Sequence, residues 1–322
     1  MRLRSVLLLS ASGILAGACV ISTQASAAPA PTESASAVTS LDVVTSNTML
    51  LPSFVTDQWA QDVRGGLIGS APYVAGHDVM VFQELFDNSA SDILMSKLKG
   101  YPYRTPVVGR STSGWDDTQG DYSAFAPEDG GVGIVSRWPI TKRIQYIYDD
   151  ACGTDSASQK GFAYARLNVN GSPVHVIGTH TQADDSLCST GEAAKIRAGQ
   201  LREMRNFVDG LHIPASEPVV YAGDFNINWH GPEYQNMLQT LSADEPTYDG
   251  VPWTMDPKTN DVAHERYPND PQQWLDYILF DNRHAHPTTW RNTGLDVSSP
   301  PWSLDGKTYH RYSDHYPVQG RS

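Results

Sequence analysis

The chain has 322 residues, of which 40% are hydrophobic and 10% aromatic, and its formal charge is −13. The apolar content excludes an intrinsically disordered chain, and the length is ample for a packed core that needs neither a metal nor a disulfide to fold. The strong acidity argues against a protein that grips the nucleic-acid backbone, because such binding requires a basic face.

The first 27 residues have the pattern of a secretory signal peptide. Arg2 and Arg4 form a basic start, an apolar stretch interrupted by small residues follows, and residues 25–27 (Ala-Ser-Ala) form a cleavage site. A lipoprotein anchor at Cys19 is the alternative, but the segment before this cysteine has one residue too many. Removal of the segment takes out two arginines and no acidic residue, which moves the charge to −15. We therefore predict a secreted, extracellular protein.

The remainder of the chain shows no obvious division. Residues 28–40 are rich in Ala, Ser and Pro, which is typical of a flexible leader. No internal repeat, later linker or further run long enough to span a bilayer is visible. We predict a single domain over residues 41–322.

Two cysteines, Cys152 and Cys188, remain after removal of the signal peptide. An even pair in an exported protein favours a disulfide, and two reduced thiols are the alternative. A metal site is disfavoured, because neither cysteine has a histidine or second cysteine at ligand spacing.

Apolar runs and their spacing predict mixed α/β or α+β layers. The expected strands cover 41–47, 77–84, 131–136, 140–148, 161–169, 174–179, 217–224, 274–280 and 315–320, and the expected helices 54–68, 87–99 and 190–211. The last helix has the best start signal, since Ser189 and Glu192 have the spacing of a capping box.

Polar residues able to bind a metal follow several of the predicted strands. They are Asn47, Glu84, His180, Asp224 with Asn226 two residues later, Asp276 and the adjacent Asp314 and His315. Taken singly, each has a simpler interpretation as a turn residue, a helix cap or a buried histidine. Six strand ends of the same kind together predict one functional rim, because ligands of α/β proteins gather at such an edge.

The residue types on this rim favour metal-assisted hydrolysis, including hydrolysis at phosphorus. Carboxylate and amide oxygens suit a hard cation such as Mg2+. Two histidines add a candidate general base and a donor to developing charge. The sequence contains no Walker loop, no HExxH segment and no GxSxG elbow.

Five segments carry a family resemblance: VFQELFDN, VIGTHTQADDSLC, YAGDFNIN, QWLDYILF and YSDHYPV. They resemble the endonuclease/exonuclease/phosphatase superfamily and, within it, the secreted bacterial neutral sphingomyelinases. The resemblance covers residues 41–319. It implies a four-layer α/β/β/α sandwich with the active site at one end, in a single catalytic domain over 41–322.

The resemblance also implies roles for the metal side of the site. Glu84 matches the main Mg2+ ligand of the family and Asn47 lies beside it, although other divalent cations remain open. Asp224 and Asn226 are expected to hold and polarise the attacking water or the phosphate. His180 is expected to donate to a phosphate oxygen or to assist the leaving group.

On the other side, His315 matches the general base, oriented by Asp276, and Asp314 is expected to support waters at the metal. Asp256 matches a further active-site aspartate of the family. The Cys152–Cys188 pair matches a family disulfide. Which histidine is the base and which assists the leaving group is left open.

The implied reaction is Mg2+-dependent hydrolysis of sphingomyelin to ceramide and phosphocholine by in-line attack of water. The expected partner is membrane sphingomyelin, met by peripheral contact, with the protein acting as a monomer and without nucleic acid. The alternatives are a related phosphodiesterase that cuts ethanolamine phospholipids or, less favoured, nucleic acid, and a non-catalytic membrane-binding module.

Residues 298–312 are predicted to form a hairpin that turns at Asp305-Gly306. Trp302 in this hairpin is a candidate for membrane contact, because aromatic residues favour the interface. A tryptophan packed within the loop is the alternative, since no phenylalanine lies beside it.

Overall fold

The structure, a computed structural model, describes residues 41–52 and 58–322. The predicted signal peptide and leader, residues 1–40, lie outside the described residues. The described residues belong to one compact unit. Among them, no helix combines the length and apolar character needed to cross a membrane.

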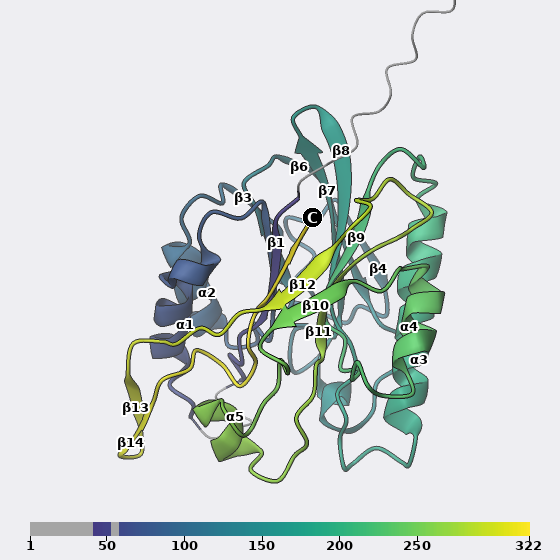
Figure 1. Ribbon diagram of the computed structural model, residues 1–322. Helices are drawn as coiled ribbons and strands as arrows, with labels where there is room; N and C mark the ends of the chain where they lie inside the picture. Colours follow the sequence, from purple (N-terminus) through teal and green to yellow (C-terminus); the bar gives the residue numbers. More distant parts are fainter. Residues whose placement is uncertain (1–40, 53–57) are drawn as a thin grey trace, which may run out of the picture. The chain divides into compact units, whose positions relative to one another are not determined.

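Two β-sheets form the centre of this unit (Figure 1). The first sheet has the order β10 (Thr247–Gly250), β12 (Arg291–Gly294), β15 (Val318–Arg321), β1 (Val43–Asn47), β2 (Val79–Gln83), β5 (Gly133–Ser136) and β3 (Tyr103–Arg104). The second has the order β11 (Asp276–Phe280), β9 (Val219–Asp224), β8 (Ser172–His180), β7 (Gly161–Val169), β6 (Ile140–Ile147) and β4 (Asp117–Gly120). The strands β13 (Trp302–Leu304) and β14 (Lys307–Tyr309) form a separate hairpin.

The two sheets pack face to face through the alternating side chains of their strands. Val79 and Val81 of β2 belong to the core that also contains the second sheet, whereas Met80 and Phe82 belong to the core beneath the first pair of helices. The contact between sheets is close, because a Cβ placed on Gly178 would lie 2.7 Å from Val81 Cγ1.

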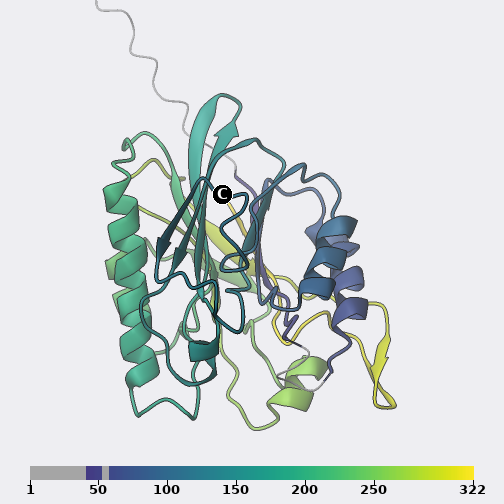
Figure 2. The same cartoon turned by 180° about the vertical axis from the view of Figure 1, so that it is seen from behind.

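Helices cover both outer faces, so the layers are α/β/β/α (Figures 1 and 2). Helices α1 (Gln61–Gly69) and α2 (Asn88–Lys97) pack on the first sheet, and α3 (Glu192–Gly210) and α4 (Tyr234–Leu241) pack on the second. The short elements η1 (Pro72–Val74), η2 (Gly153–Ala157) and α5 (Asp261–Arg266) complete the fold. The predicted four-layer sandwich is confirmed.

Two helices begin later than the sequence suggests. The helix expected over 54–68 starts at Gln61, because Ala60 has a left-handed backbone with φ of 49°; residues 53–57 lie outside the described part of the chain. Helix α3 starts at Glu192 after Gly191, which has φ of 74°. Only half of the expected capping box forms, since Glu192 accepts from the Ser189 backbone N–H at 2.6 Å.

Strand pairing brings the predicted rim together. Strands β1 and β2 are parallel and pair Asn47 with Gln83 at their ends. Strands β8 and β9 are also parallel and pair His180 with Asp224. Strand β11 runs antiparallel to β9, so its first residue, Asp276, lies opposite Asp224 at the same edge. Both sheets therefore deliver functional groups to one end of the sandwich.

Candidate active site

Asn47 is the link between the two sheets at this rim. Its side-chain Nδ2 donates to Glu84 Oε1 and to Asp224 Oδ2, each at 2.9 Å. Its Oδ1 accepts from the Met49 backbone N–H at 3.1 Å. The amide is buried, so these bonds fix a carboxylate from each sheet on either side of it.

Glu84 follows β2 in a left-handed conformation with φ of 55°. For a residue other than glycine this backbone is uncommon and costs on the order of 1–3 kcal/mol, a strain that concentrates at functional sites. Burial, and next the charge of Asp314, raise the pKa of the Glu84 carboxyl above its ordinary value.

Asp224 ends β9 and is also buried. Burial, followed by the neighbouring charge of Asp276, raises the pKa of Asp224 to about 7. Its Oδ1 accepts from the Asn226 backbone N–H at 2.9 Å, and the Asn226 Nδ2 donates to the Thr181 carbonyl at 3.1 Å. Asn226 therefore helps to fix the position of the Asp224 carboxylate.

The oxygen donors of this site fit a hard divalent cation. Glu84 and Asp224 are held 2.9 Å from the same amide nitrogen, and burial together with a neighbouring carboxylate raises the pKa of each. A cation bound there would offset this cost of burying negative charge. A ligand atom from each of Asp224, Asp276 and His315 also lies within 4.8 Å of the others. The hydrogen bond between Asp276 and His315 engages one oxygen of that carboxylate, and Glu84 with Asp224 offers a second pair of oxygens that could hold a hard cation.

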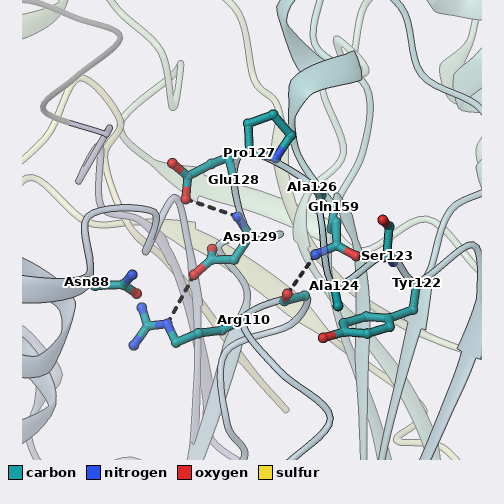
Figure 3. A pocket seen from close by; sticks show the side chains of 11 residues that line it. Asn88, Arg110, Tyr122, Ser123, Ala124, Ala126, Pro127, Glu128, Asp129 and Gln159 are labelled. Carbon is teal, nitrogen blue, oxygen red and sulfur yellow. Dashed lines mark hydrogen bonds and ion pairs between the residues drawn. The ribbon is translucent and has the colours of Figure 1, made fainter.

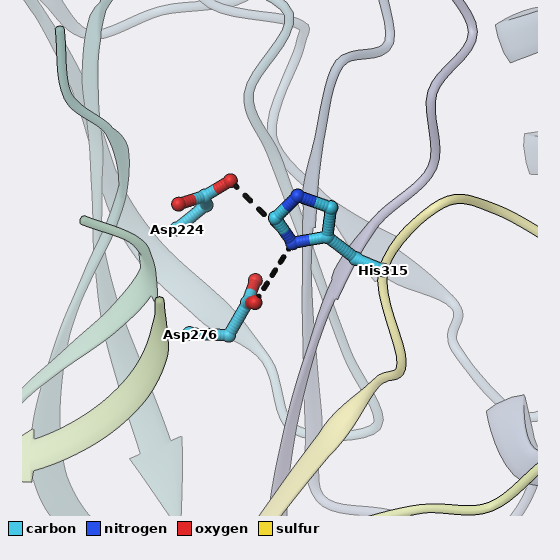
Figure 4. Close-up of side chains that lie close together, drawn as sticks. All are labelled: Asp224, Asp276 and His315. Atoms are coloured by element: carbon cyan, nitrogen blue, oxygen red, sulfur yellow. Dashed lines mark hydrogen bonds and ion pairs between the residues drawn. The ribbon is translucent and has the colours of Figure 1, made fainter. Parts of the chain in front are cut away.

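His315 and Asp276 form a hydrogen-bonded pair (Figure 4). His315 Nδ1 lies 2.9 Å from Asp276 Oδ2 and 3.7 Å from Asp224 Oδ2. Burial by itself lowers the pKa of His315, but the charges of Asp276 and Asp224 outweigh it and hold this pKa well above its ordinary value. With Nδ1 facing the carboxylates, Nε2 is the nitrogen that remains for substrate or water.

His180 faces the same centre from the end of β8. Its Nε2 lies 3.8 Å from Asp224 Oδ2 and 4.0 Å from Glu84 Oε1. Burial, and next the charges of Lys160 and His315, keep the pKa of His180 well below its ordinary value. His180 therefore places a ring nitrogen beside the carboxylates of both sheets.

Lys160 is the residue of this site that sequence reasoning did not identify. It is buried, and its Nζ contacts Asp155 Oδ2 at 2.8 Å, the Thr181 carbonyl at 3.2 Å and His180 Nε2 at 3.3 Å. Buried lysines are rare unless they are paired. Lys160 directly precedes the first residue of β7. A charged residue at the start of a strand is usually exposed to solvent, so the sequence holds no local signal for its role.

Asp314 and Asp256 lie at the edge of the cluster. Asp314 accepts from the Ser313 hydroxyl at 3.1 Å, and the Nε of Arg266 lies 3.7 Å from its other oxygen. Asp256 comes near through its neighbour Met255, which forms a β-bridge with His315.

The Asp256 carboxylate is engaged within its own loop. It accepts from the Lys258 backbone N–H at 2.9 Å, from the Thr259 hydroxyl at 2.8 Å and from Gln272 Nε2 at 2.8 Å. These bonds order the segment that carries Met255, the residue paired with His315. A direct catalytic role for Asp256 stays a prediction.

The Cys152–Cys188 disulfide is present, with the two Cα atoms 5.4 Å apart. It joins the loop before β7 to the loop after β8. The disulfide expected from the cysteine count is therefore confirmed, and it braces two loops that leave from the active-site rim.

Replacing both cysteines with serine is expected to lower the free energy of unfolding by about 4 kcal/mol. This value is the chain-entropy term for a sequence separation of 36 residues. Urea unfolding of the oxidised wild type and of the double variant measures it. An unchanged unfolding midpoint would contradict the prediction.

The predicted hairpin turns at Asp305 and Gly306, which have φ of 48° and 78°, but its tryptophan is turned inward. Trp302 is only 4% exposed, stacks on Tyr309 with ring centroids 4.7 Å apart, and donates to the Arg311 carbonyl at 2.8 Å. A ring enclosed in this way is not available to a bilayer. The membrane-contact interpretation of Trp302 is corrected to that of a packed tryptophan.

Comparison with known proteins identifies the family to which this fold belongs. Residues 57–315 match the model of the Endonuclease/Exonuclease/phosphatase family. Sphingomyelinase C from Bacillus cereus is 44% identical over 290 residues, which cover 86% of this chain and 87% of that protein.

Two crystal structures share the fold closely. Sphingomyelinase C from Streptomyces griseocarneus is 48% identical with a TM-score of 0.85, covering 88% of this chain and 99% of that one. A beta toxin variant from Staphylococcus aureus with bound magnesium ions is 43% identical with a TM-score of 0.86, covering 88% of this chain and 100% of that one. The family match, the sequence identity and the shared four-layer sandwich show that this chain belongs to the endonuclease/exonuclease/phosphatase family and, within it, to the bacterial sphingomyelinases, and that it is a phosphodiester hydrolase.

Proposed function

We propose that the protein hydrolyses the phosphodiester of sphingomyelin to ceramide and phosphocholine in a Mg2+-dependent reaction. The observation that carries this proposal is the meeting of Glu84, Asp224 and His315 at one rim, in a chain 44% identical to a sphingomyelinase C. Carboxylates for a hard cation and a carboxylate-paired histidine are the groups that such a reaction needs.

The metal is proposed to bind at Glu84, with Asn47 fixing the carboxylate and Asp224 close by. When bound, Mg2+ supplies charge neutralisation and polarisation of the phosphate. Asp224, supported by Asn226, holds the attacking water or the phosphate. Asp314 acts on the metal side through ordered water.

His315 is proposed as the general base, with Nε2 taking the proton of the attacking water. Asp276 holds the tautomer by accepting from Nδ1. The base must be neutral when water attacks, and the surrounding carboxylates raise its pKa.

His180 and Lys160 are proposed to serve the phosphate and the leaving group. Lys160 Nζ lies 3.3 Å from His180 Nε2 and places a fixed positive charge beside it, and His180 is proposed to act on a phosphate oxygen or on the leaving group. Charge arranged before the reaction begins stabilises a developing anion at little reorganisation cost.

Lys160→Met is expected to lower kcat by roughly 10–1000-fold, because it removes one fixed charge from the place where negative charge develops. Lys160→Arg, which keeps the charge, is the matched comparison and should retain more activity. Hydrolysis of a soluble phosphocholine ester measures both. Equal losses in the two variants would indicate a packing role for Lys160.

We further propose that the protein acts outside the cell, as a monomer, by peripheral contact with membranes and without nucleic acid. The signal-peptide pattern and the disulfide support export, since disulfides persist in oxidising compartments. The formal charge of −13 supports a zwitterionic lipid over a polyanion.

The test is release of phosphocholine from sphingomyelin vesicles, first with Mg2+ and then with excess chelator. We expect release only with the metal, and restoration when Mg2+ is added back. Folded protein that releases nothing in Mg2+ would overturn the proposal. Parallel assays on ethanolamine phospholipid and on DNA would then identify a related phosphodiesterase, and vesicle binding without any hydrolysis would identify a membrane-binding module.

A further inference from the structure

We propose that two loops beside the active site, which carry Phe125 and Leu187, form the surface that docks on a zwitterionic phosphocholine bilayer. We call these loops, residues 121–130 and 181–191, the Phe125–Leu187 ridge. The inference rests on the proposed lipid substrate and adds the contact by which the protein reaches it.

The ridge holds the two most exposed large hydrophobic side chains of the described residues. Phe125 is 96% exposed and Leu187 is 74% exposed, followed by Val63 at 54%. Placing such side chains in water forfeits burial free energy, and the aromatic ring suits the membrane interface. Trp302 of the hairpin offers no comparable exposed ring, because it is buried.

Strand pairing places the ridge at the active-site rim. Strand β4 ends at Gly120 opposite Ile147, the last residue of β6, and Ile147 lies opposite Gly161, the first residue of β7. The adjoining strand β8 ends at His180 at this same edge. Both loops of the ridge therefore leave the second sheet where the site is.

The first loop of the ridge is held at its base (Figure 3). The Ser123 backbone N–H donates to Gln159 Oε1 at 2.7 Å, and Gln159 Nε2 donates to the Gly109 carbonyl at 2.7 Å. Arg110 Nε donates to Asp129 Oδ2 at 3.1 Å. Phe125 therefore projects from an anchored loop.

The second loop is braced as firmly. Asp185 accepts from the Thr154 backbone N–H at 2.8 Å and from the Leu187 backbone N–H at 2.8 Å, and the disulfide holds the next residue, Cys188. A contact surface that is already ordered loses little conformational entropy on binding, which favours insertion of both side chains together.

The ridge is coupled to the site by a short path. Asp155 Oδ2 accepts from the Ala183 backbone N–H at 2.9 Å and from Lys160 Nζ at 2.8 Å, and Lys160 contacts His180. A bilayer seated on Phe125 and Leu187 would thus meet the protein beside the catalytic histidines, where a lipid head group must enter.

The charge of the ridge selects the lipid. The two loops contain five acidic residues and no lysine, arginine or histidine. Anionic bilayers attract basic segments, with about 1 kcal/mol for each lysine or arginine near the surface. An acidic, apolar-tipped surface fits a zwitterionic phosphocholine bilayer instead.

The test uses Phe125→Ser, Leu187→Ser and the double variant. In a His315→Ala background with Mg2+ present, flotation with sphingomyelin and phosphatidylcholine vesicles measures binding without hydrolysis. We expect each substitution to weaken binding about tenfold and the double variant about 100-fold, from the burial of one large side chain each. Val169→Ser, at the opposite end of β7, is the control and should bind as the parent does. Phe125→Trp should retain binding and show a blue-shifted emission with vesicles.

With His315 restored, the same variants should cleave a soluble phosphocholine ester at the wild-type rate and lose activity only on vesicles. Unchanged vesicle binding in the double variant, equal losses on the soluble ester, or stronger binding when phosphatidylserine is added would overturn the proposal. A wild type that binds vesicles through Phe125 and Leu187 but cleaves no phosphocholine substrate would refute the proposed function and leave the ridge standing.

Discussion

Glu84→Gln is expected to lower activity by roughly a thousandfold at low Mg2+, because a neutral amide replaces the carboxylate that we propose as the metal ligand. The loss corresponds to several kcal/mol of charge stabilisation. The fold should survive, since Gln can still accept the hydrogen bond from Asn47 Nδ2. Hydrolysis of sphingomyelin vesicles across a Mg2+ titration measures the effect, and part of the loss should be recovered at high Mg2+.

Glu245→Gln is the matched control for this experiment. Glu245 accepts from Trp229 Nε1 at 2.9 Å on an exposed part of the surface, and its amide can accept the same bond. We expect wild-type turnover and an unchanged Mg2+ requirement. Near-normal turnover of Glu84→Gln at low Mg2+ would contradict the proposal that Glu84 is the metal ligand.

His315→Ala is expected to reduce turnover by about 10²–10⁴-fold, the range that general acid–base catalysis contributes. The loss should be seen on vesicles and on a soluble phosphocholine ester alike, because it lies in the chemical step. Asp276→Asn should cause a smaller loss, since the imidazole remains while its orienting carboxylate is replaced. Initial rates at saturating substrate measure both variants.

The control here is His286→Ala, at an exposed position. It should leave turnover unchanged, and circular dichroism should show all three variants folded. Retained activity in a folded His315→Ala protein would refute the base role. His180 would then be the candidate to examine next.

Much of the rim was predictable because it lies at strand ends. Apolar runs locate β1, β2, β8 and β9 well, so Asn47, Glu84, His180 and Asp224 stand out as the polar residues that follow them. The runs do not say which sheet each strand joins. The family resemblance supplied the four-layer arrangement that places these ends together.

The parts that sequence missed depend on tertiary contacts. Lys160 has no local signature, and its role emerges only from its distance to His180. Trp302 has the composition of an interfacial residue, but Tyr309 and the Arg311 carbonyl enclose it. Short segments such as α5 and β3 have too few residues to show a period.

The bridge that Asn47 forms between Glu84 and Asp224 makes the geometry of the site depend on the alignment of the two sheets. Neither sheet holds a complete set of groups, and a slip of one residue along a strand, about 3.3 Å, exceeds the length of either hydrogen bond. Partial detachment of one sheet would abolish the activity while most of the secondary structure persisted. On heating, activity should therefore be lost together with the near-ultraviolet circular dichroism, or before the far-ultraviolet signal is lost. It should never be lost later than the far-ultraviolet signal.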